Sequence, residues 1–288
     1  MPRVTPDQIR QMKAKGERIA MLTAYDYPTA SILDSVGVPM LLVGDTLGMV
    51  VLGNDSTLPV TVDDIIRHAQ AVTRGAKRAL VVADMPFGSF QVSPEDTMRN
   101  AARIMKEAGV QAVKLEGGVR VAASVRALVE AGIPVMGHVG LTPQSVNVFG
   151  GFKVQGKTEA TARALLADVA ALEAAGVFAI VLELVPTELA RLVTERTSAP
   201  TIGIGSGVHC DGEVQVIHDI MGLFPDFTPR HTKRFADLGA AMRAGVEAYV
   251  REVRDRSFPT EAQSAPMDAR LIERLRAETP PADESGEG

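Results

Sequence analysis

The sequence is poor in aromatic residues and has no excess of positive charge. Only 4% of its 288 residues are Phe, Tyr or Trp, tryptophan is absent, and the formal net charge is -5. Proteins that bind single-stranded nucleic acid stack the bases on aromatic side chains, and proteins that bind duplexes place many Lys and Arg side chains on phosphates. The composition therefore argues against a nucleic-acid partner.

Cysteine and long apolar segments are also scarce. Cys210 is the single cysteine, so a disulfide within the chain is impossible, and a reducing compartment is the default expectation. No uncharged apolar run approaches the roughly 20 residues that a membrane span needs. Residues 1–20 lack the apolar segment of an export signal. We expect a cytoplasmic protein with no membrane partner.

The sequence does contain a series of short aliphatic runs, each followed by a turn signal and an amphipathic stretch. Aliphatic strands that alternate with helices indicate a parallel sheet that is buried on both faces. The expected strands are residues 19–24, 39–44, 79–83, 112–115, 134–137, 179–182, 200–204 and 222–224. The expected helices are residues 28–36, 61–74, 93–108, 119–131, 158–175, 187–197 and 213–220, with an outer helix at 233–254.

Eight such strands favour a closed (β/α)8 barrel over an open doubly wound sheet, and no dinucleotide-binding glycine motif follows the first strand. We expect one barrel domain with an N-terminal helix over residues 1–265. A partly disordered tail should follow over residues 266–288, since residues 279–288 are rich in Pro, Glu and Gly. Two long connections, 45–60 and 139–157, follow strands and should lie at the C-terminal end of the barrel, where barrel enzymes place substrate loops.

Five of the aliphatic runs end in an ionisable residue, and in a barrel all five would meet at one mouth. These residues are Asp45, Asp84, Glu116, His138 and Glu183. Crowded carboxylates disfavour joint ionisation, and a hard divalent cation is the natural compensation. Oxygen ligands without paired His or Cys favour Mg²⁺ or Mn²⁺ over Zn²⁺. The alternative is that each acid only caps the following helix, which suits one acid better than four acids and a histidine.

Other residues near these strand ends allow two interpretations each. Lys114 lies two residues before Glu116 on the same face of its strand, where it could neutralise the acids or hold a substrate carboxylate. His138 could be a satisfied buried histidine or part of a site. The glycine-rich segment 203–207 could bind phosphate through its amides or form a tight turn. Cys210 has no setting typical of a nucleophile.

Seven short motifs occur along the chain, and together they are specific although each alone is weak. They are MLTAYD at 21–26, VGDTLGMV at 43–50, DSTLPV at 55–60, ADMPFGS at 83–89, VKLEGG at 113–118, HVGLTPQ at 138–144 and VIHD at 216–219. On these motifs the chain, from about residue 4 to residue 265, resembles the ketopantoate (3-methyl-2-oxobutanoate) hydroxymethyltransferase family.

The resemblance implies a (β/α)8 TIM barrel of the phosphoenolpyruvate mutase and isocitrate lyase type. It implies that a hydroxymethyl group passes from 5,10-methylenetetrahydrofolate, the co-substrate, to 3-methyl-2-oxobutanoate. The product is 2-dehydropantoate, an intermediate of pantothenate biosynthesis in the coenzyme A pathway. The family also implies dependence on Mg²⁺ and a homo-oligomer, often a decamer. The alternatives are a Mg²⁺-dependent C–C lyase of the isocitrate lyase group and a non-catalytic barrel that binds a keto acid.

Carried over motif by motif, the resemblance makes Asp45 and Asp84 ligands of Mg²⁺, with Glu116 supporting the metal site. Glu183 would be the general base that removes the C3 proton and leaves a Mg²⁺-stabilised enolate. The substrate-binding residues would be Asp45, Thr46, Asp84, Lys114 and His138.

Two positions depart from the family pattern. Thr46 stands where the family usually has Ser, which keeps the hydroxyl and adds a methyl group. Residues 205–211 read GSGVHCD in place of the commoner GAGNGCD, which bears on the contacts with the folate and leaves the metal site unaffected.

Overall fold

Within residues 2–224 and 229–278, which the computed structural model describes, eight short parallel strands form a closed barrel. Each strand pairs with the next along the chain, and the last pairs with the first. The strands are β1 (Ile19–Thr23), β2 (Met40–Val43), β3 (Leu80–Asp84), β4 (Ala112–Glu116), β5 (Val135–Gly140), β6 (Ala179–Glu183), β7 (Thr201–Ile204) and β8 (Gly212–Gln215). The predicted (β/α)8 barrel is therefore confirmed.

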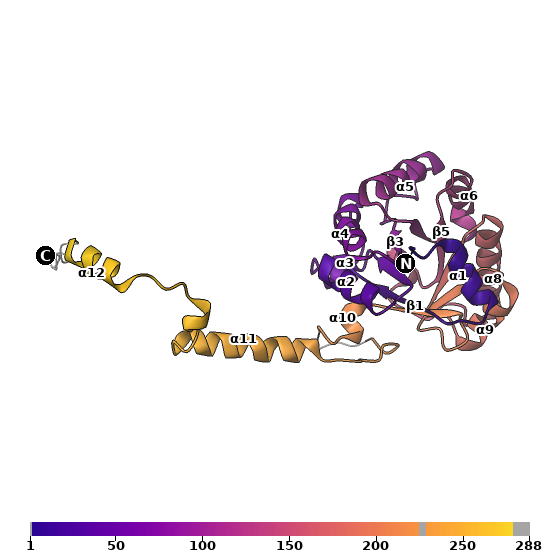
Figure 1. Cartoon of the computed structure of the whole chain (residues 1–288). Coiled ribbons are helices and arrows are strands. Elements are labelled where there is room, and N and C mark those ends of the chain that lie inside the picture. Colours follow the sequence, from indigo (N-terminus) through magenta and orange to yellow (C-terminus); the bar gives the residue numbers. More distant parts are fainter. Residues whose placement is uncertain (1, 225–228, 279–288) are drawn as a thin grey trace, which may run out of the picture. The chain divides into compact units, whose positions relative to one another are not determined.

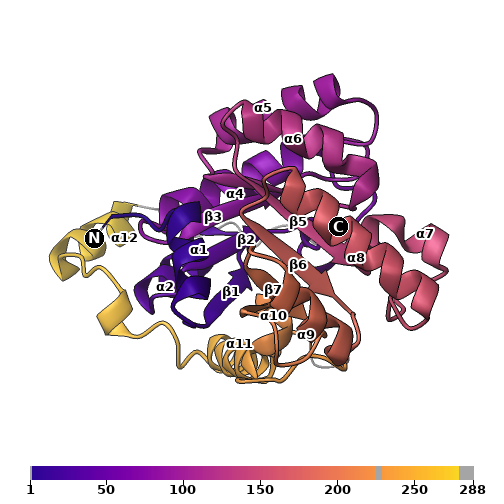
Figure 2. The same cartoon turned by 90° about the vertical axis from the view of Figure 1, so that its right-hand side faces the viewer.

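Helices cover the outside of the barrel. The described α-helices are α1 (Pro6–Ala14), α2 (Tyr27–Ser35), α3 (Leu47–Val50), α4 (Val62–Gly75), α5 (Pro94–Ala108), α6 (Ala122–Glu130), α7 (Val146–Phe149), α8 (Glu159–Ala174), α9 (Thr187–Arg196), α10 (Ile217–Ile220), α11 (Leu238–Arg254) and α12 (Ala269–Glu278). Short 3-10 turns are η1 (Val119–Val121), η2 (Pro143–Ser145) and η3 (Glu261–Gln263). Figure 1 shows α2, α4, α5, α6, α8 and α9 around the strands, and Figure 2 shows α1 and α7 at opposite ends of the barrel. None of these helices is long and apolar enough to cross a membrane.

The chain divides into two compact units, one ending at Ala236 and the other beginning at Asp237. The first unit contains the barrel. The second contains α11 and α12, in which no described residue is buried. The predicted domain end at residue 265 falls later than this division and stays a prediction. A partly disordered tail was predicted over residues 266–288. Ala269–Glu278 of that segment form α12, and residues 279–288 lie outside the described residues.

The strands are buried on both sides because alternate side chains fill the barrel or pack under the helices. Along β3, Leu80 and Val82 belong to the cluster inside the barrel, whereas Val81 belongs to the cluster between strands and helices. Every residue of β3 is buried, as the continuous aliphatic run predicts.

The same alternation carries ionisable side chains into the mouth, by which we mean the C-terminal end of the barrel. On β4, Ala112 points inside, and Lys114 and Glu116 follow on the same face at steps of two residues. On β6, Val181 points inside and Glu183 follows two residues later. Apolar residues thus fill the barrel interior, and polar residues occupy its mouth.

The predicted eighth strand was wrong. Residues 222–224 follow α10 as a turn, and the last strand is β8, at the start of the segment for which a helix over 213–220 was predicted. Only Ile217–Ile220 of that segment is helical.

The composition of β8 explains the error. Its polar residues Glu213 and Gln215 are half-buried and alternate with buried ones, so the strand has no aliphatic run. A Cβ at Gly212 would lie 2.3 Å from the carbonyl oxygen of Ile19, and only glycine lets β8 pair this closely with β1.

Capping residues define several helix ends. Ser93 caps α5 by accepting a hydrogen bond from the Asp96 N–H at 3.1 Å. Glycines follow the C-terminal ends of four helices and all have positive φ angles: Gly37, Gly109, Gly132 and Gly176. The outer helix begins at Leu238 and not at residue 233, because Asp237 provides its N-terminal cap.

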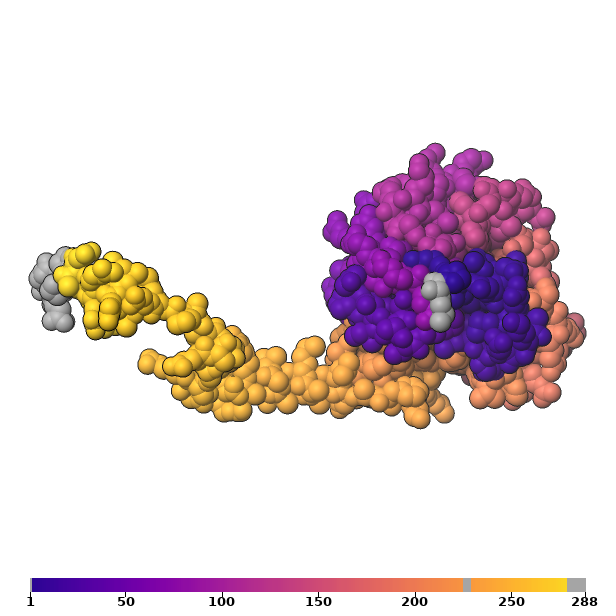
Figure 3. Space-filling view, viewed as in Figure 1, coloured from indigo at the N-terminus to yellow at the C-terminus, as the bar shows by residue number. Residues whose placement is uncertain are grey.

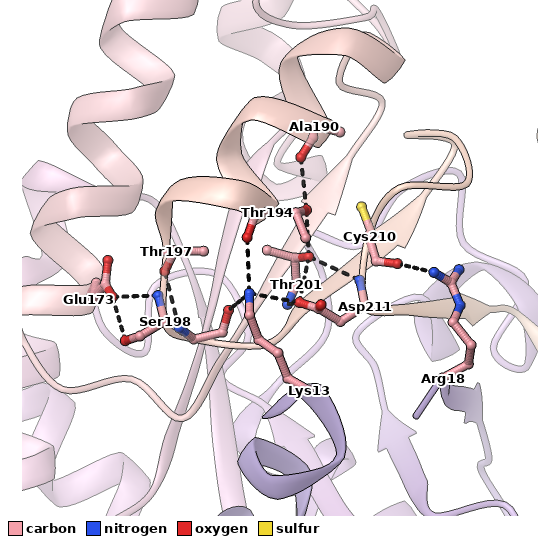
Figure 4. A network of polar contacts seen from close by, with 11 residues as sticks. Lys13, Arg18, Glu173, Ala190, Thr194, Thr197, Ser198, Thr201, Cys210 and Asp211 are labelled. Atoms are coloured by element: carbon pink, nitrogen blue, oxygen red, sulfur yellow. Dashed lines mark hydrogen bonds and ion pairs between the residues drawn. The ribbon is translucent and has the colours of Figure 1, made fainter. Parts of the chain in front are cut away.

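The end of the barrel opposite the mouth is covered by the N-terminal segment, as Figure 3 shows in indigo. Ile9 of α1 is fully buried in the inner cluster. Lys13 donates hydrogen bonds to the carbonyl oxygens of Thr194 and Ala199, both at 3.1 Å, and pairs with Asp211 at 3.0 Å (Figure 4). One ammonium group thereby satisfies three oxygens at this floor of the barrel.

Candidate functional site

A cavity of about 860 Å³ opens at the mouth. Its walls include Thr46 and Asn54 from the connection 45–60, and Leu141 and Phe152 from the connection 139–157. Both long connections thus lie at the C-terminal end, as predicted. Strand β6 contributes Glu183 to the wall.

The five predicted strand-end residues come together beside this cavity. Four of them are at most 6% exposed, and the side chain of the fifth, Glu183, is 17% exposed. The four buried ones are Asp45, Asp84, Glu116 and His138. We call Asp45, Asp84, Glu116 and Glu183 the carboxylate cluster.

Lys114 is the cation of this site. Its Nζ lies 2.5 Å from Asp84 Oδ1 and 3.3 Å from His138 Nδ1. Burial alone would lower the pKa of Lys114, but Asp84, Glu116 and Asp45 raise it above its ordinary value. The lysine therefore stays charged and holds the carboxylate cluster together.

His138 is neutral, because burial lowers its pKa well below the ordinary value and the charge of Lys114 lowers it further. An ammonium group can only donate, so Nδ1 accepts from Lys114 and the ring proton resides on Nε2. That nitrogen lies 3.2 Å from Glu183 Oε2, although the two groups are not aligned as a hydrogen bond. His138 thus connects Lys114 to Glu183.

Gln144 connects the other two carboxylates. Its Nε2 donates to Asp45 Oδ2 at 2.8 Å and to the Met85 carbonyl oxygen at 3.0 Å, while its backbone N–H donates to Glu116 Oε2 at 3.0 Å. The Asp45 backbone N–H donates in turn to Asp84 Oδ2 at 3.0 Å. Asp45, Asp84 and Glu116 are therefore joined in one continuous hydrogen-bond network.

Crowding shifts the protonation of the cluster. The pKa of Asp45 is raised to about 7, first by burial and then by Asp84, against the lowering effects of Lys114 and of the Gln144 hydrogen bond. The pKa of Glu116 is raised well above its ordinary value, by burial and then by Asp45. Added positive charge would favour the ionised forms of both acids.

A hard cation would supply that charge, and the donor set is suited to one. Among residues 2–224 and 229–278, no three Asp, Glu, His or Cys side chains form a complete ligand group. Mg²⁺ does not need one, since it commonly takes one or two carboxylates and completes its shell with water and substrate oxygens. Asp45 and Asp84, joined through the backbone N–H of Asp45, fit that role.

Contacts from two other segments fix the backbone position of Glu183. The next residue, Leu184, has φ of 46°, and the Gly140 backbone packs so closely that a Cβ there would lie 2.2 Å from the Glu183 carbonyl oxygen. Ser206 donates to the Leu182 carbonyl oxygen at 2.7 Å and accepts from the Val185 N–H at 3.1 Å. The backbone around Glu183 is thus held from both sides.

The remaining predicted residues have simpler settings. Thr46 starts α3 and lines the cavity without a side-chain capping bond. Segment 203–207 runs from the end of β7 into a bend in which Gly205 packs against Leu184, which favours the structural interpretation. Cys210 is fully buried, and burial raises the pKa of its thiol to about 11, which agrees with the absence of a nucleophile's setting in the sequence.

Gln144 was missed as a site residue. The sequence placed Gln144 in the connection 139–157, at the mouth. Its polar amide, directly after Pro143, was the available signal. What no sequence pattern indicated is that it bridges two acids from different strands.

The cavity reaches beyond the carboxylate cluster. Segment 229–231, which follows β8 and α10, contributes Arg230 and His231 to its wall. The pKa of Glu183 is raised to about 7 by burial, and Lys114 and then His231 lower it. His231 therefore lies within electrostatic range of the carboxylate that was predicted to act as a base.

Comparison with known proteins agrees with this geometry. A model of the ketopantoate hydroxymethyltransferase family matches residues 3–261. A 3-methyl-2-oxobutanoate hydroxymethyltransferase of Dehalococcoides mccartyi is 57% identical over 274 residues, which covers 95% of this chain and 97% of that protein. The protein of the same name from Gluconacetobacter diazotrophicus is 59% identical over 265 residues, covering 92% and 95%.

Solved structures are similar in fold at low sequence identity. A phosphonopyruvate hydrolase in complex with oxalate and Mg²⁺ matches with a TM-score of 0.57 at 13% identity, covering 95% of both chains. A 2,3-dimethylmalate lyase of the PEP mutase/isocitrate lyase superfamily matches with a TM-score of 0.56 at 18% identity, covering 95% of this chain and 98% of that one. The barrel type is thereby confirmed. By its match over most of its length, the chain belongs to the ketopantoate hydroxymethyltransferase family.

Proposed function

We propose that this protein transfers a hydroxymethyl group from 5,10-methylenetetrahydrofolate to 3-methyl-2-oxobutanoate and so forms 2-dehydropantoate for pantothenate biosynthesis. The relatives that are 57% and 59% identical bear the name of this activity. The observation that carries the proposal is the position of Glu183, at the wall of the cavity and off the Asp45–Asp84 pair, where a base can reach a bound keto acid.

Asp45 and Asp84 would hold a Mg²⁺ ion, with Glu116 supporting them through Gln144. The ion, when bound, stabilises negative charge that develops on the carbonyl oxygen of a keto acid. Its charge would also favour the ionised form of Asp45, whose pKa burial and then Asp84 raise to about 7.

Lys114 and Thr46 would bind the keto acid. Lys114 remains charged and lies next to Asp84, where a substrate carboxylate could share its ammonium group. Thr46 directly follows Asp45 and presents its hydroxyl at the cavity wall. His138 would help to place the substrate, because its buried Nε2 makes no hydrogen bond within the described residues and lies 3.2 Å from Glu183 Oε2.

Glu183 would remove the C3 proton. A general base is most effective when its pKa lies near the working pH, and burial raises the pKa of Glu183 to about 7. Lys114 limits this rise, so that the ionised form remains available at neutral pH.

The rest of the cavity would take the folate. Its volume of about 860 Å³ is in the upper part of the usual range for sites that hold drug-sized molecules, about 300 to 1,000 Å³. Apolar side chains that suit a flat aromatic ring line it away from the cluster: Met49, Val50, Phe152, Val154 and Phe224. We further propose a cytoplasmic location and a homo-oligomer, as the family resemblance implies.

Deuterium exchange at C3 of 3-methyl-2-oxobutanoate tests the assignment. The protein should catalyse Mg²⁺-dependent exchange without folate, and should form 2-dehydropantoate when 5,10-methylenetetrahydrofolate is added. The Glu183→Gln variant should still bind the keto acid but lose exchange. Retained exchange in this variant would remove Glu183 from the role of base, and release of glyoxylate from isocitrate would favour a lyase instead.

A further inference from the structure

The Tyr25 side chain is buried beside the carboxylate cluster, and its hydroxyl is left without a partner. The residue is 2% exposed, and within the described part of the chain its hydroxyl makes no hydrogen bond. Thr23 is near, but it does not meet hydrogen-bond geometry, and its own hydroxyl accepts from the Ile217 N–H at 3.0 Å. Buried hydroxyls almost always have partners, so this exception needs an explanation.

Strand pairing sets Tyr25 at the level of the proposed metal site. Thr23 of β1 pairs with Leu42 of β2, so the residues two places further along are Tyr25 and Gly44. A Cβ on Gly44 would lie 3.3 Å from Asp84 Oδ2. The backbone of Tyr25 therefore lies next to the strand end that leads into Asp45.

The ring is also held rigidly. His68 Nδ1 contacts the Tyr25 carbonyl oxygen at 2.7 Å, and the His218 ring lies 5.5 Å from the Tyr25 ring, centroid to centroid. His218 stacks in turn on Phe224, which lines the cavity. The His68 contact with the Tyr25 backbone and the His218 ring thus hold the buried phenol in place.

The charges around the hydroxyl keep its proton in place. Burial raises the pKa of Tyr25, and the neighbouring Asp84, Asp45 and Asp219 raise it further, although Thr23 opposes this. The group is thus a neutral hydrogen-bond donor, and it lies within electrostatic range of the carboxylates Asp45 and Asp84.

We propose that Tyr25 is a substrate-binding residue whose hydroxyl donates a hydrogen bond to an oxygen atom of the bound α-keto acid. The identity of the ligand, an α-keto acid, rests on the proposed function. The position of the site rests on the unpartnered hydroxyl of Tyr25. A keto acid brings several acceptor oxygens into this mouth, where Lys114 already contacts Asp84 Oδ1 and Gln144 already donates to Asp45 Oδ2. Binding then supplies the partner that the empty protein lacks.

Tyr25→Phe removes the oxygen and leaves the ring packing intact. In the metal-free, substrate-free protein the unfolding midpoint should be unchanged or higher, because an unsatisfied buried group has been removed. The affinity for 3-methyl-2-oxobutanoate, measured by melting shift in Mg²⁺, should fall about tenfold or more, as expected for a hydrogen bond to a charged acceptor. Tyr27→Phe is the matched control, since Tyr27 is 55% exposed, and it should change neither quantity.

Two results would overturn the proposal. Wild-type keto-acid affinity in Tyr25→Phe would show that the hydroxyl does not touch the substrate. A lower unfolding midpoint in the empty variant, with unchanged affinity, would show a structural hydrogen bond instead. The C3 exchange assay on the wild-type protein is scored separately: its failure contradicts the proposed transferase, while the melting-shift comparison still decides whether Tyr25 binds the keto acid.

Discussion

Replacement of Lys114 by Met should destabilise the protein strongly at alkaline pH and weakly at acidic pH. Methionine keeps the apolar stem and removes the ammonium group, which lies 2.5 Å from Asp84. Removing one partner of a buried ion pair typically costs about 3–5 kcal/mol, because the other charge is left uncompensated. Lys114 also lowers the pKa values of Asp45, Glu116 and Glu183, so all three must rise in the variant.

The sign of the pH dependence follows from those pKa values. A carboxyl group whose pKa is raised by folding favours the folded state below its unfolded pKa, and this advantage is lost as the pH rises to the folded value. In the wild type the loss ends near the values of about 7 for Asp45 and Glu183. Without Lys114 the folded-state pKa values are higher, so stability continues to fall up to a higher pH. A rise of one unit in the folded-state pKa of one carboxyl group costs about 1.4 kcal/mol of stability.

Urea unfolding of the metal-free protein measures this directly. The difference in unfolding free energy between wild type and Lys114→Met should be about 3–5 kcal/mol near pH 8 and clearly smaller near pH 5.5. Lys13→Met, at the floor of the barrel, is the control: it loses an ion pair with Asp211 away from the carboxylate cluster and should show the same loss at both pH values. An equal loss at both pH values for Lys114→Met would refute the electrostatic account of this residue.

Three further predictions concern the base, the metal and the backbone of the site. The rate of C3 exchange should rise with pH and reach half its maximum near pH 7, because only ionised Glu183, whose pKa is about 7, can accept the proton; a flat profile would contradict this. Asp84→Asn should abolish most of the increase in unfolding midpoint that Mg²⁺ gives the wild type, and an unaltered Mg²⁺ titration would exclude a ligand role. Gly140→Ala should cost about 1–3 kcal/mol in urea unfolding and slow exchange, since the added Cβ meets the Glu183 carbonyl oxygen at 2.2 Å. Gly53→Ala, also at positive φ but in open space, should cost less and leave exchange unchanged.

Most of the barrel could be predicted because its signals are local. Aliphatic runs such as Leu80 to Val82, with glycine at the ends of the preceding helices, repeat often enough to identify strand and crossover. Strand β8 could not be predicted, because what places it is the close backbone contact between Gly212 and Ile19, nearly two hundred residues apart in the chain. A pairing of that kind leaves no periodic pattern in the sequence.

One part of the candidate site could likewise be predicted from the sequence, and another part could not. The meeting of Asp84, Glu116 and Glu183 follows from strand order and the two-residue alternation, so a sequence that specifies the barrel also specifies the cluster. The hydrogen bonds of Gln144 depend on how a loop folds back over the mouth, and the unpartnered state of Tyr25 depends on what is missing around it. Neither is encoded in residue type or spacing.

The floor of the barrel has a consequence for how the chain is made. A ribosome produces α1 first, yet the carbonyl groups of Thr194 and Ala199 that anchor Lys13 are translated 181 and 186 residues later. Strand β1 likewise has one unpaired edge until β8 has been translated. Until then the nascent chain exposes Ile9 and an open sheet edge, which is the kind of surface that chaperones bind and that aggregates when translation stalls.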